Sequence, residues 1–139
     1  MLAFLEKKWQ ICGATYCKEV NMPQIVLECS DNIFERNFSV VFHDIHQILT
    51  EHLPTELASC KSRVIRHTDF FIGEGTTNNG FVHLSISVIK GRSTPLLDSI
   101  AKIILEKLKV FFSHSLQELK LQITVAIKAL PEVYQKYKN

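Results

Sequence analysis

The sequence predicts an α+β domain built from two strand–helix–strand units in tandem. Two long segments repeat apolar residues every three or four positions, which is typical of amphipathic helices. The segments around them are short apolar runs or alternate apolar with polar residues, which is typical of strands. A helix between two strands can connect them in parallel, so we expect one four-stranded sheet with both helices on one face. The other face then needs cover, which self-association of the chain would supply.

The first unit begins with the apolar strand 24–28, which is followed by a helical pattern from Ile33 to Leu53. Asn32 and Glu35 have the spacing of a capping pair at the start of this helix. Pro54 ends it, because proline cannot continue a helix. The unit is completed by a strand predicted over 62–72.

The second unit begins with the alternating strand 81–88. The turn-rich residues 73–80 before it predict a hairpin-type connection to the previous strand. The second helix is expected to start with Thr94 as N-cap and Pro95 at the first helical position, and to reach about Ser115. A last alternating strand follows over 119–128.

Composition argues against several classes of function. The formal net charge of +2, from 16 basic and 14 acidic residues, is too small for a nucleic-acid-binding protein. No apolar stretch approaches a membrane span, and the start lacks a secretion signal, so we expect a cytoplasmic protein without a membrane partner. Cysteines without CxxC spacing, and His43 and His46 without partners at ligand spacing, argue against a metal site. Both histidines are expected to face solvent.

Pro23 is the first candidate catalytic residue. It follows Met22 and directly precedes the first strand. If translation starts at Met22 and this methionine is removed, Pro23 carries a free secondary amine, which is a real base. Inside a longer chain the same nitrogen is a tertiary amide without a proton. In that case Pro23 would only open an edge strand, where its missing N–H is harmless.

Arg92 lies just before the second helix, where the helix dipole disfavours a positive charge. A bound anion would gain from this arginine and from the unpaired N–H groups of the first turn, which predicts a carboxylate or phosphate site. Lys61 and Arg63 are two positions apart on a strand and therefore point to the same side. Two cations on one face repel unless an anion or carboxylate lies between them. Arg66 would point to the other side and is expected at the surface.

Four ordered segments carry a family resemblance: 25–33 (IVLECSDNI), 61–64 (KSRV), 81–84 (FVHL) and 91–93 (GRS). Together they resemble the 5-carboxymethyl-2-hydroxymuconate isomerase family of the tautomerase superfamily, over Pro23 to about Leu130. The resemblance implies a tautomerase-like fold and a homotrimer whose sheets surround a central channel. It also implies a mature chain that starts at the proline matching Pro23, which moves the proton. Residues 1–22 are then an upstream leader or a misassigned start, and 23–139 are the isomerase domain.

We therefore expect a cofactor-free isomerase, using no metal, that moves a proton within an unsaturated, multiply carboxylated keto acid. Pro23 would be the base, and Arg92, Lys61 and Arg63 would bind the carboxylates of this small substrate. Family members more often have arginine at the position of Lys61, and lysine keeps the charge but loses the planar fork. The implied substrate is 5-carboxymethyl-2-hydroxymuconate, in the breakdown of 4-hydroxyphenylacetate by way of homoprotocatechuate. The alternatives are a tautomerase of different substrate range, or a non-catalytic trimeric assembly or binding protein if the leader is retained.

Overall fold

The computed structural model describes residues 9–12, 15–18, 22–137 and 139. Its elements in chain order are β1 (Trp9–Cys12), β2 (Thr15–Lys18), β3 (Gln24–Ser30), α1 (Ser39–His52), the 3-10 turn η1 (Leu57–Ser59), β4 (Lys61–His67), β5 (Asn79–Val88), α2 (Thr94–Phe111), α3 (Ser113–Glu118) and β6 (Lys120–Ala129). Within these described ranges, no helix has both the length and the apolar character needed to cross a membrane.

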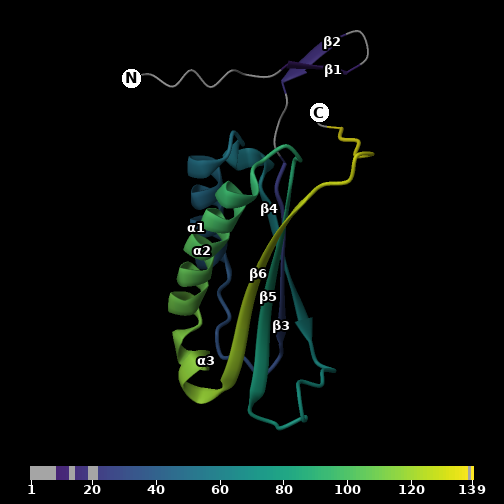
Figure 1. The fold of residues 1–139 in the computed structure, drawn as a ribbon. Helices are drawn as coiled ribbons and strands as arrows, with labels where there is room; N and C mark the ends of the chain where they lie inside the picture. Colours follow the sequence, from purple (N-terminus) through teal and green to yellow (C-terminus); the bar gives the residue numbers. More distant parts are fainter. Residues whose placement is uncertain (1–8, 13–14, 19–21, 138) are drawn as a thin grey trace.

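Strands β3 to β6 form one mixed sheet in the order β4-β3-β5-β6. β3 is parallel to β4 and β5 is parallel to β6, whereas the central pair of β3 and β5 is antiparallel. Figure 1 shows α1 and α2 side by side on the same face of this sheet, and no helix of the described residues covers the other face, here called the open face. The predicted α+β architecture of two tandem βαβ units with both helices on one face is therefore confirmed.

The strands β1 and β2 lie in the predicted leader and pair antiparallel in a separate two-stranded sheet, with Trp9 opposite Lys18. The rest of the leader, residues 1–8, 13–14 and 19–21, lies outside the described residues. The expected separation of residues 1–22 from the active protein stays a prediction.

The predicted hairpin between β4 and β5 is wrong. β3 lies between these strands, with Gln24 opposite Lys61 of β4 on one side and Ser87 of β5 on the other. The connection from β4 to β5 therefore crosses the end of β3, where the Asn32 side-chain amide donates to the carbonyl of Asn79 at 2.8 Å. Because the chain must turn to make this crossing, β4 ends at His67 and does not continue to residue 72 as predicted.

The core lies between the sheet and its two helices. Each strand of the central pair sends alternate side chains toward the helices, as the period of two predicts. The fully or almost fully buried apolar residues of this cluster are Ile25, Leu27 and Cys29 of β3, Val82, Leu84, Ile86 and Val88 of β5, Val41, Ile45, Ile48 and Leu49 of α1, Ile100, Ile104 and Leu108 of α2, and Ile33, Leu53 and Phe112 outside these elements. The opposite face carries mostly polar and charged side chains, including Lys61 and Arg63, together with a few apolar ones such as Val26 and Ile65.

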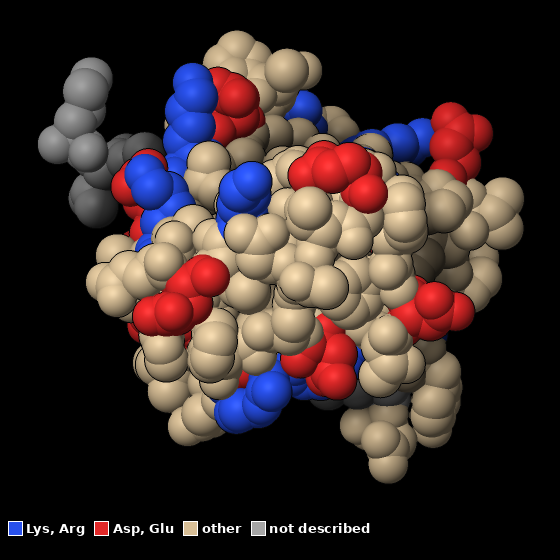
Figure 2. All heavy atoms as spheres, turned by 90° about the horizontal axis from the view of Figure 1, so that it is seen from below, with Lys and Arg blue, Asp and Glu red and all other residues tan. Residues whose placement is uncertain are grey.

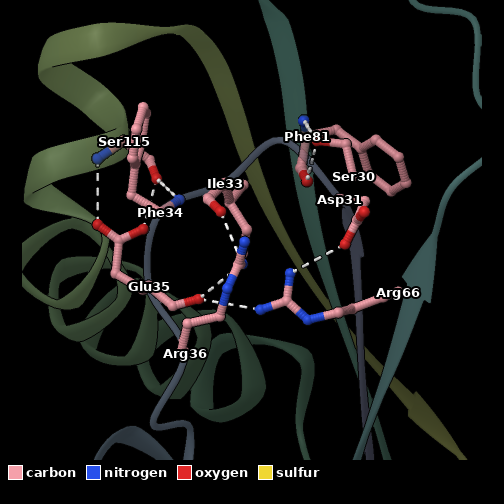
Figure 3. A network of polar contacts seen from close by, with 9 residues as sticks. All are labelled: Ser30, Asp31, Ile33, Phe34, Glu35, Arg36, Arg66, Phe81 and Ser115. Atoms are coloured by element: carbon pink, nitrogen blue, oxygen red, sulfur yellow. Dashed lines mark hydrogen bonds and ion pairs between the residues drawn. The ribbon is translucent and has the colours of Figure 1, made fainter.

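Helix α1 starts at Ser39, six residues after the predicted start at Ile33. Glu35 does not act as a capping residue, because its carboxylate accepts hydrogen bonds from the backbone N–H of Ser115, at 3.1 Å, and from the Ser115 hydroxyl. The Ser115 Oγ in turn accepts from the backbone N–H of Phe34 at 2.9 Å (Figure 3). These contacts to α3 hold the segment before α1 in a non-helical conformation.

Arg66 belongs to the same network. Its Nη2 donates to the carbonyl of Glu35 at 3.0 Å, and its Nη1 lies 3.6 Å from a carboxylate oxygen of Asp31 (Figure 3). The guanidinium also lies over the Phe38 ring, 5.3 Å from its centroid. Arg66 does point away from Lys61 and Arg63, as predicted, but it is a half-buried residue that ties the connection after β3 to β4.

Helix α2 has Ser93 as its N-cap, one residue before the expected Thr94. The Ser93 hydroxyl accepts a hydrogen bond from the backbone N–H of Leu96 at 3.3 Å. The helix ends at Phe111, and the short α3 carries the chain to the start of β6. Because Ser93 is the cap, Arg92 lies outside the helix, in the loop that connects β5 to α2.

Candidate active site

Pro23 is buried and lies immediately before β3, the strand between β4 and β5. The alternative in which Pro23 only opens an edge strand is therefore wrong. Its carbonyl accepts a hydrogen bond from the backbone N–H of Lys61 at 3.2 Å, which joins the starts of the parallel strands β3 and β4. In the 139-residue chain the Pro23 nitrogen is acylated by Met22, whose side chain is also buried. A proton-transfer role thus requires cleavage or initiation that frees this nitrogen.

The sheet register places Lys61 and Arg63 close to Pro23. Lys61 lies opposite Gln24 and Arg63 lies opposite Val26, so both cations are on the open face at the start of β4. This agrees with the prediction that they share one side of a strand. Both are exposed in the single chain, at the end of the sheet where β3 and β4 begin.

The two cations are not separated by a carboxylate. Arg63 Nη1 donates to the neutral side-chain carbonyl of Gln24 at 3.0 Å, and Lys61 Nζ donates to the backbone carbonyl of Ser59 at 3.3 Å. Among the residues that the structure describes, no ion pair neutralises Lys61, Arg63 or Arg92. Their positive charge remains available for an anionic ligand.

Arg92 reaches the same end of the sheet from a different element. It follows β5, whose Ser87 lies opposite Gln24 at the start of β3. Gly91 before it has a φ of 101°, a left-handed conformation that glycine adopts without strain. The Arg92 Nε is buried and has no hydrogen-bond partner among the described residues. A buried donor without a partner is costly, so this atom favours an acceptor from a ligand.

Two further residues at this end, Gln24 and Tyr134, were not predicted. The Gln24 side-chain amide lies between Arg63 and Tyr134, with its Nε2 3.5 Å from the Tyr134 hydroxyl. Gln24 required the register between β3 and β4, which places it opposite Lys61. Nothing in the sequence pattern indicated Tyr134, because it follows the last strand in a segment without periodicity.

The opposite end of the molecule differs in its charge distribution. Figure 2 shows basic and acidic side chains interspersed there around a largely uncharged centre. The start of β3 and β4, by contrast, combines a buried proline with cations that pair with no carboxylate of the described residues. We therefore place the candidate site at the upper end of the sheet in Figure 1, where β3 and β4 begin and β5 and β6 end.

The remaining candidate groups take structural positions. His46 does not face solvent as expected, because its Nε2 is hydrogen-bonded to the Ser62 hydroxyl at 2.6 Å. Burial raises the pKa of the Cys29 and Cys60 thiols, and the nearby Arg66 and Lys61 offset this only in part. A protonated thiol is a weak nucleophile. Among the described residues, no three His, Cys, Asp or Glu side chains are grouped so as to hold a metal ion.

Residues 23–139 match the family described as 5-carboxymethyl-2-hydroxymuconate isomerase, and the matched range begins at Pro23. The chain belongs to this family. The resemblance expected from the four sequence segments is therefore confirmed, and the protein is an isomerase of the tautomerase superfamily. A comparison of the sequence with curated proteins finds no match.

Solved structures with the same fold agree with this assignment. A 5-carboxymethyl-2-hydroxymuconate isomerase from Deinococcus radiodurans R1 aligns with a TM-score of 0.76 and 20% identity, over 86% of this chain and 90% of that chain. A 5-carboxymethyl-2-hydroxymuconate delta-isomerase aligns with a TM-score of 0.75 and 16% identity, over 85% and 89%. A fused 4-OT protein described as a symmetric trimer aligns with a TM-score of 0.64 and 10% identity, over 84% and 92%.

Proposed function

We propose that this isomerase acts on an unsaturated, multiply carboxylated 2-hydroxy acid, with the free amine of Pro23 as its base. The observation that carries the proposal is the convergence of Pro23, Lys61, Arg63 and Arg92 at one end of the sheet. Three different parts of the fold contribute to it: the start of β3, the start of β4 and the loop after β5. The family match that begins at Pro23 supports the role of this residue.

In the proposed reaction, the Pro23 nitrogen takes the proton of the substrate's 2-hydroxyl group. The electron pair of the broken O–H bond becomes the C2 carbonyl as the conjugated double bonds shift along the chain. The resulting prolinium then returns the proton to a distant carbon, which regenerates the free amine and gives the enone form. The step is internally balanced, so it consumes no oxidant, reductant or cofactor.

The three cations have two tasks in this mechanism. Lys61, Arg63 and Arg92 bind the substrate carboxylates and stabilise the negative charge that develops on the conjugated oxygen. Their positive charge also lowers the pKa of the nearby prolyl amine, because a cation disfavours its protonated form. A base with a pKa closer to neutrality is present in its free form at physiological pH.

By its family, the substrate we propose is 5-carboxymethyl-2-hydroxymuconate, formed in the breakdown of 4-hydroxyphenylacetate by way of homoprotocatechuate. We further propose a homotrimer in which the open face of the sheet packs toward neighbouring subunits. Two observations support this assembly: a solved neighbour is described as a symmetric trimer, and none of the described helices lies on that face. The presence of Lys61 in place of an arginine favours a second candidate, a tautomerase that acts on related enol acids of different size.

The test compares the full chain with a chain that starts at Met22 and exposes Pro23 after methionine removal. We expect turnover of the 2-hydroxymuconate only in the shorter chain, because acylation removes the lone pair that accepts the proton. A Pro23→Ala variant of the shorter chain is the matched control and should fold but turn over far more slowly. Intact mass must establish both N-termini. Equal turnover by the full and the short chains would show that Pro23 is not the base. Turnover of a panel of smaller enol acids distinguishes the 5-carboxymethyl-2-hydroxymuconate isomerase from the tautomerase of different substrate range.

A further inference from the structure

The segment after β6 is attached across the candidate site by three polar contacts. The backbone N–H of Leu130 donates to the carbonyl of Val88 at 2.7 Å, which extends the pairing of β6 with β5. Glu132 forms an ion pair with Lys90, at 2.9 Å, in the loop that carries Arg92. Tyr134 then reaches the Gln24 side chain beside Pro23. The C-terminal segment therefore contacts the end of β5, the loop after β5 and the start of β3, all of which border the site.

The contacts of Gln24 determine the direction of its hydrogen bonds. Its Oε1 accepts from Arg63 Nη1 at 3.0 Å, and a guanidinium can only donate. The amide Nε2 must therefore be the donor to the Tyr134 hydroxyl oxygen, at 3.5 Å. A flipped amide would place two donors against each other at Arg63. The hydroxyl proton of Tyr134 is consequently left to donate elsewhere, and no described residue accepts it.

We propose that Tyr134 is a substrate-binding residue, whose hydroxyl donates a hydrogen bond to a carboxylate oxygen held beside Arg63. This rests on the proposed function in so far as the ligand is the carboxylated substrate. The Tyr134 side chain is 39% exposed, so its hydroxyl can meet a ligand from solvent. Gln24 is a positioning residue, because its amide orients both the Arg63 guanidinium and the Tyr134 hydroxyl toward the same region.

The first experiment measures binding without turnover. The probe is trans,trans-muconate, an unsaturated dicarboxylate that lacks the enol proton, titrated by calorimetry into the full chain and into the chain that starts at Met22. Tyr134→Phe should weaken binding by about 3- to 10-fold, the effect of one hydrogen bond that competes with water. The matched control is Tyr137→Phe, because Tyr137 is 89% exposed in the same segment and should bind as the wild type does.

The second experiment tests the role of Gln24. In a Gln24→Glu variant the new carboxylate accepts the Tyr134 hydroxyl proton, so this proton is no longer available to the ligand. The double variant Gln24→Glu/Tyr134→Phe should therefore bind muconate as tightly as Gln24→Glu alone. In the wild-type background, by contrast, Tyr134→Phe weakens binding. A purely structural role of Tyr134 would give the same loss in both backgrounds and would overturn the proposal.

The outcomes separate this inference from the proposed function. Equal binding by Tyr134→Phe and Tyr137→Phe, or no binding of muconate to either wild-type chain, overturns the role of Tyr134. Turnover of the 2-hydroxymuconate by the chain that starts at Met22 is scored independently. Turnover with unchanged Tyr134→Phe binding refutes only the tyrosine contact. Weakened binding in Tyr134→Phe without any turnover in the wild type supports the contact and refutes the proposed reaction.

Discussion

Glu35→Ala should destabilise the fold strongly, although Glu35 is only half-buried. Its carboxylate accepts from the backbone N–H of Ser115 at 3.1 Å and from the Ser115 hydroxyl, and Ser115 is 0% exposed (Figure 3). Removing this acceptor leaves a buried N–H without a partner, which costs about 1 to 3 kcal/mol. The charged hydrogen bond to the hydroxyl adds to this, although water replaces part of it. We expect a loss of about 2 to 3 kcal/mol in the free energy of unfolding.

Urea unfolding followed by circular dichroism measures this loss. For a urea dependence of about 1 to 3 kcal/mol per molar, the midpoint should fall by about 0.7 to 3 M. All variants must be compared at one protein concentration, because the proposed self-association would stabilise the folded state by mass action. Glu35→Gln keeps one oxygen acceptor and should lose about half as much. Glu118→Ala is the matched control, because Glu118 is exposed in α3 and has no partner among the described residues.

If the contacts of Glu35 with α3 hold the segment before α1, the two alanine variants should differ clearly in their free energy of unfolding. Glu118→Ala should remain within about 0.5 kcal/mol of the wild type, as is usual for an exposed position. If Glu35→Ala unfolds at the same urea concentration as Glu118→Ala, the contacts of Glu35 with α3 do not hold this segment. The late start of α1 would then need another cause.

Three further outcomes are expected. Arg92→Ala should lower kcat/KM about 10- to 100-fold, as the loss of a charged contact would, while the melting temperature stays nearly unchanged; the reverse pattern in a thermal melt and an activity assay would remove it from the site. Lys61→Arg should keep or raise kcat/KM, whereas Lys61→Ala should lower it. Wild-type kinetics in both variants would exclude Lys61 from the site. Burial lowers the pKa of His46 below its ordinary value of 6.5, and the charge of nearby His43 makes a smaller contribution in the same direction. Acidification through that value therefore favours the unfolded chain, and His46→Gln, which can keep the bond to Ser62, should lose less stability than the wild type between about pH 7 and about pH 5. Equal losses in urea titrations would contradict this.

The candidate site could be predicted in part. Lys61 and Arg63 follow from strand parity, and Arg92 follows from the conflict between its charge and the start of a helix. Their convergence with Pro23 required the sheet order, because residues 23, 61 and 92 are far apart in the chain. Tyr134 required the structure entirely, because an irregular segment after the last strand has no period that reports its neighbours.

The sequence alone determined the local elements and the faces they bury. Periods of two and 3.6 are properties of the backbone, so apolar patterning shows which side chains point to the core before any partner is known. Only the tertiary structure decided where elements pair and where they begin. β3 lies between β4 and β5 because its backbone bonds to both strands, and α1 starts late because Glu35 bonds to Ser115, 80 residues away. Such contacts between distant segments outweigh local preferences, and no local pattern records them.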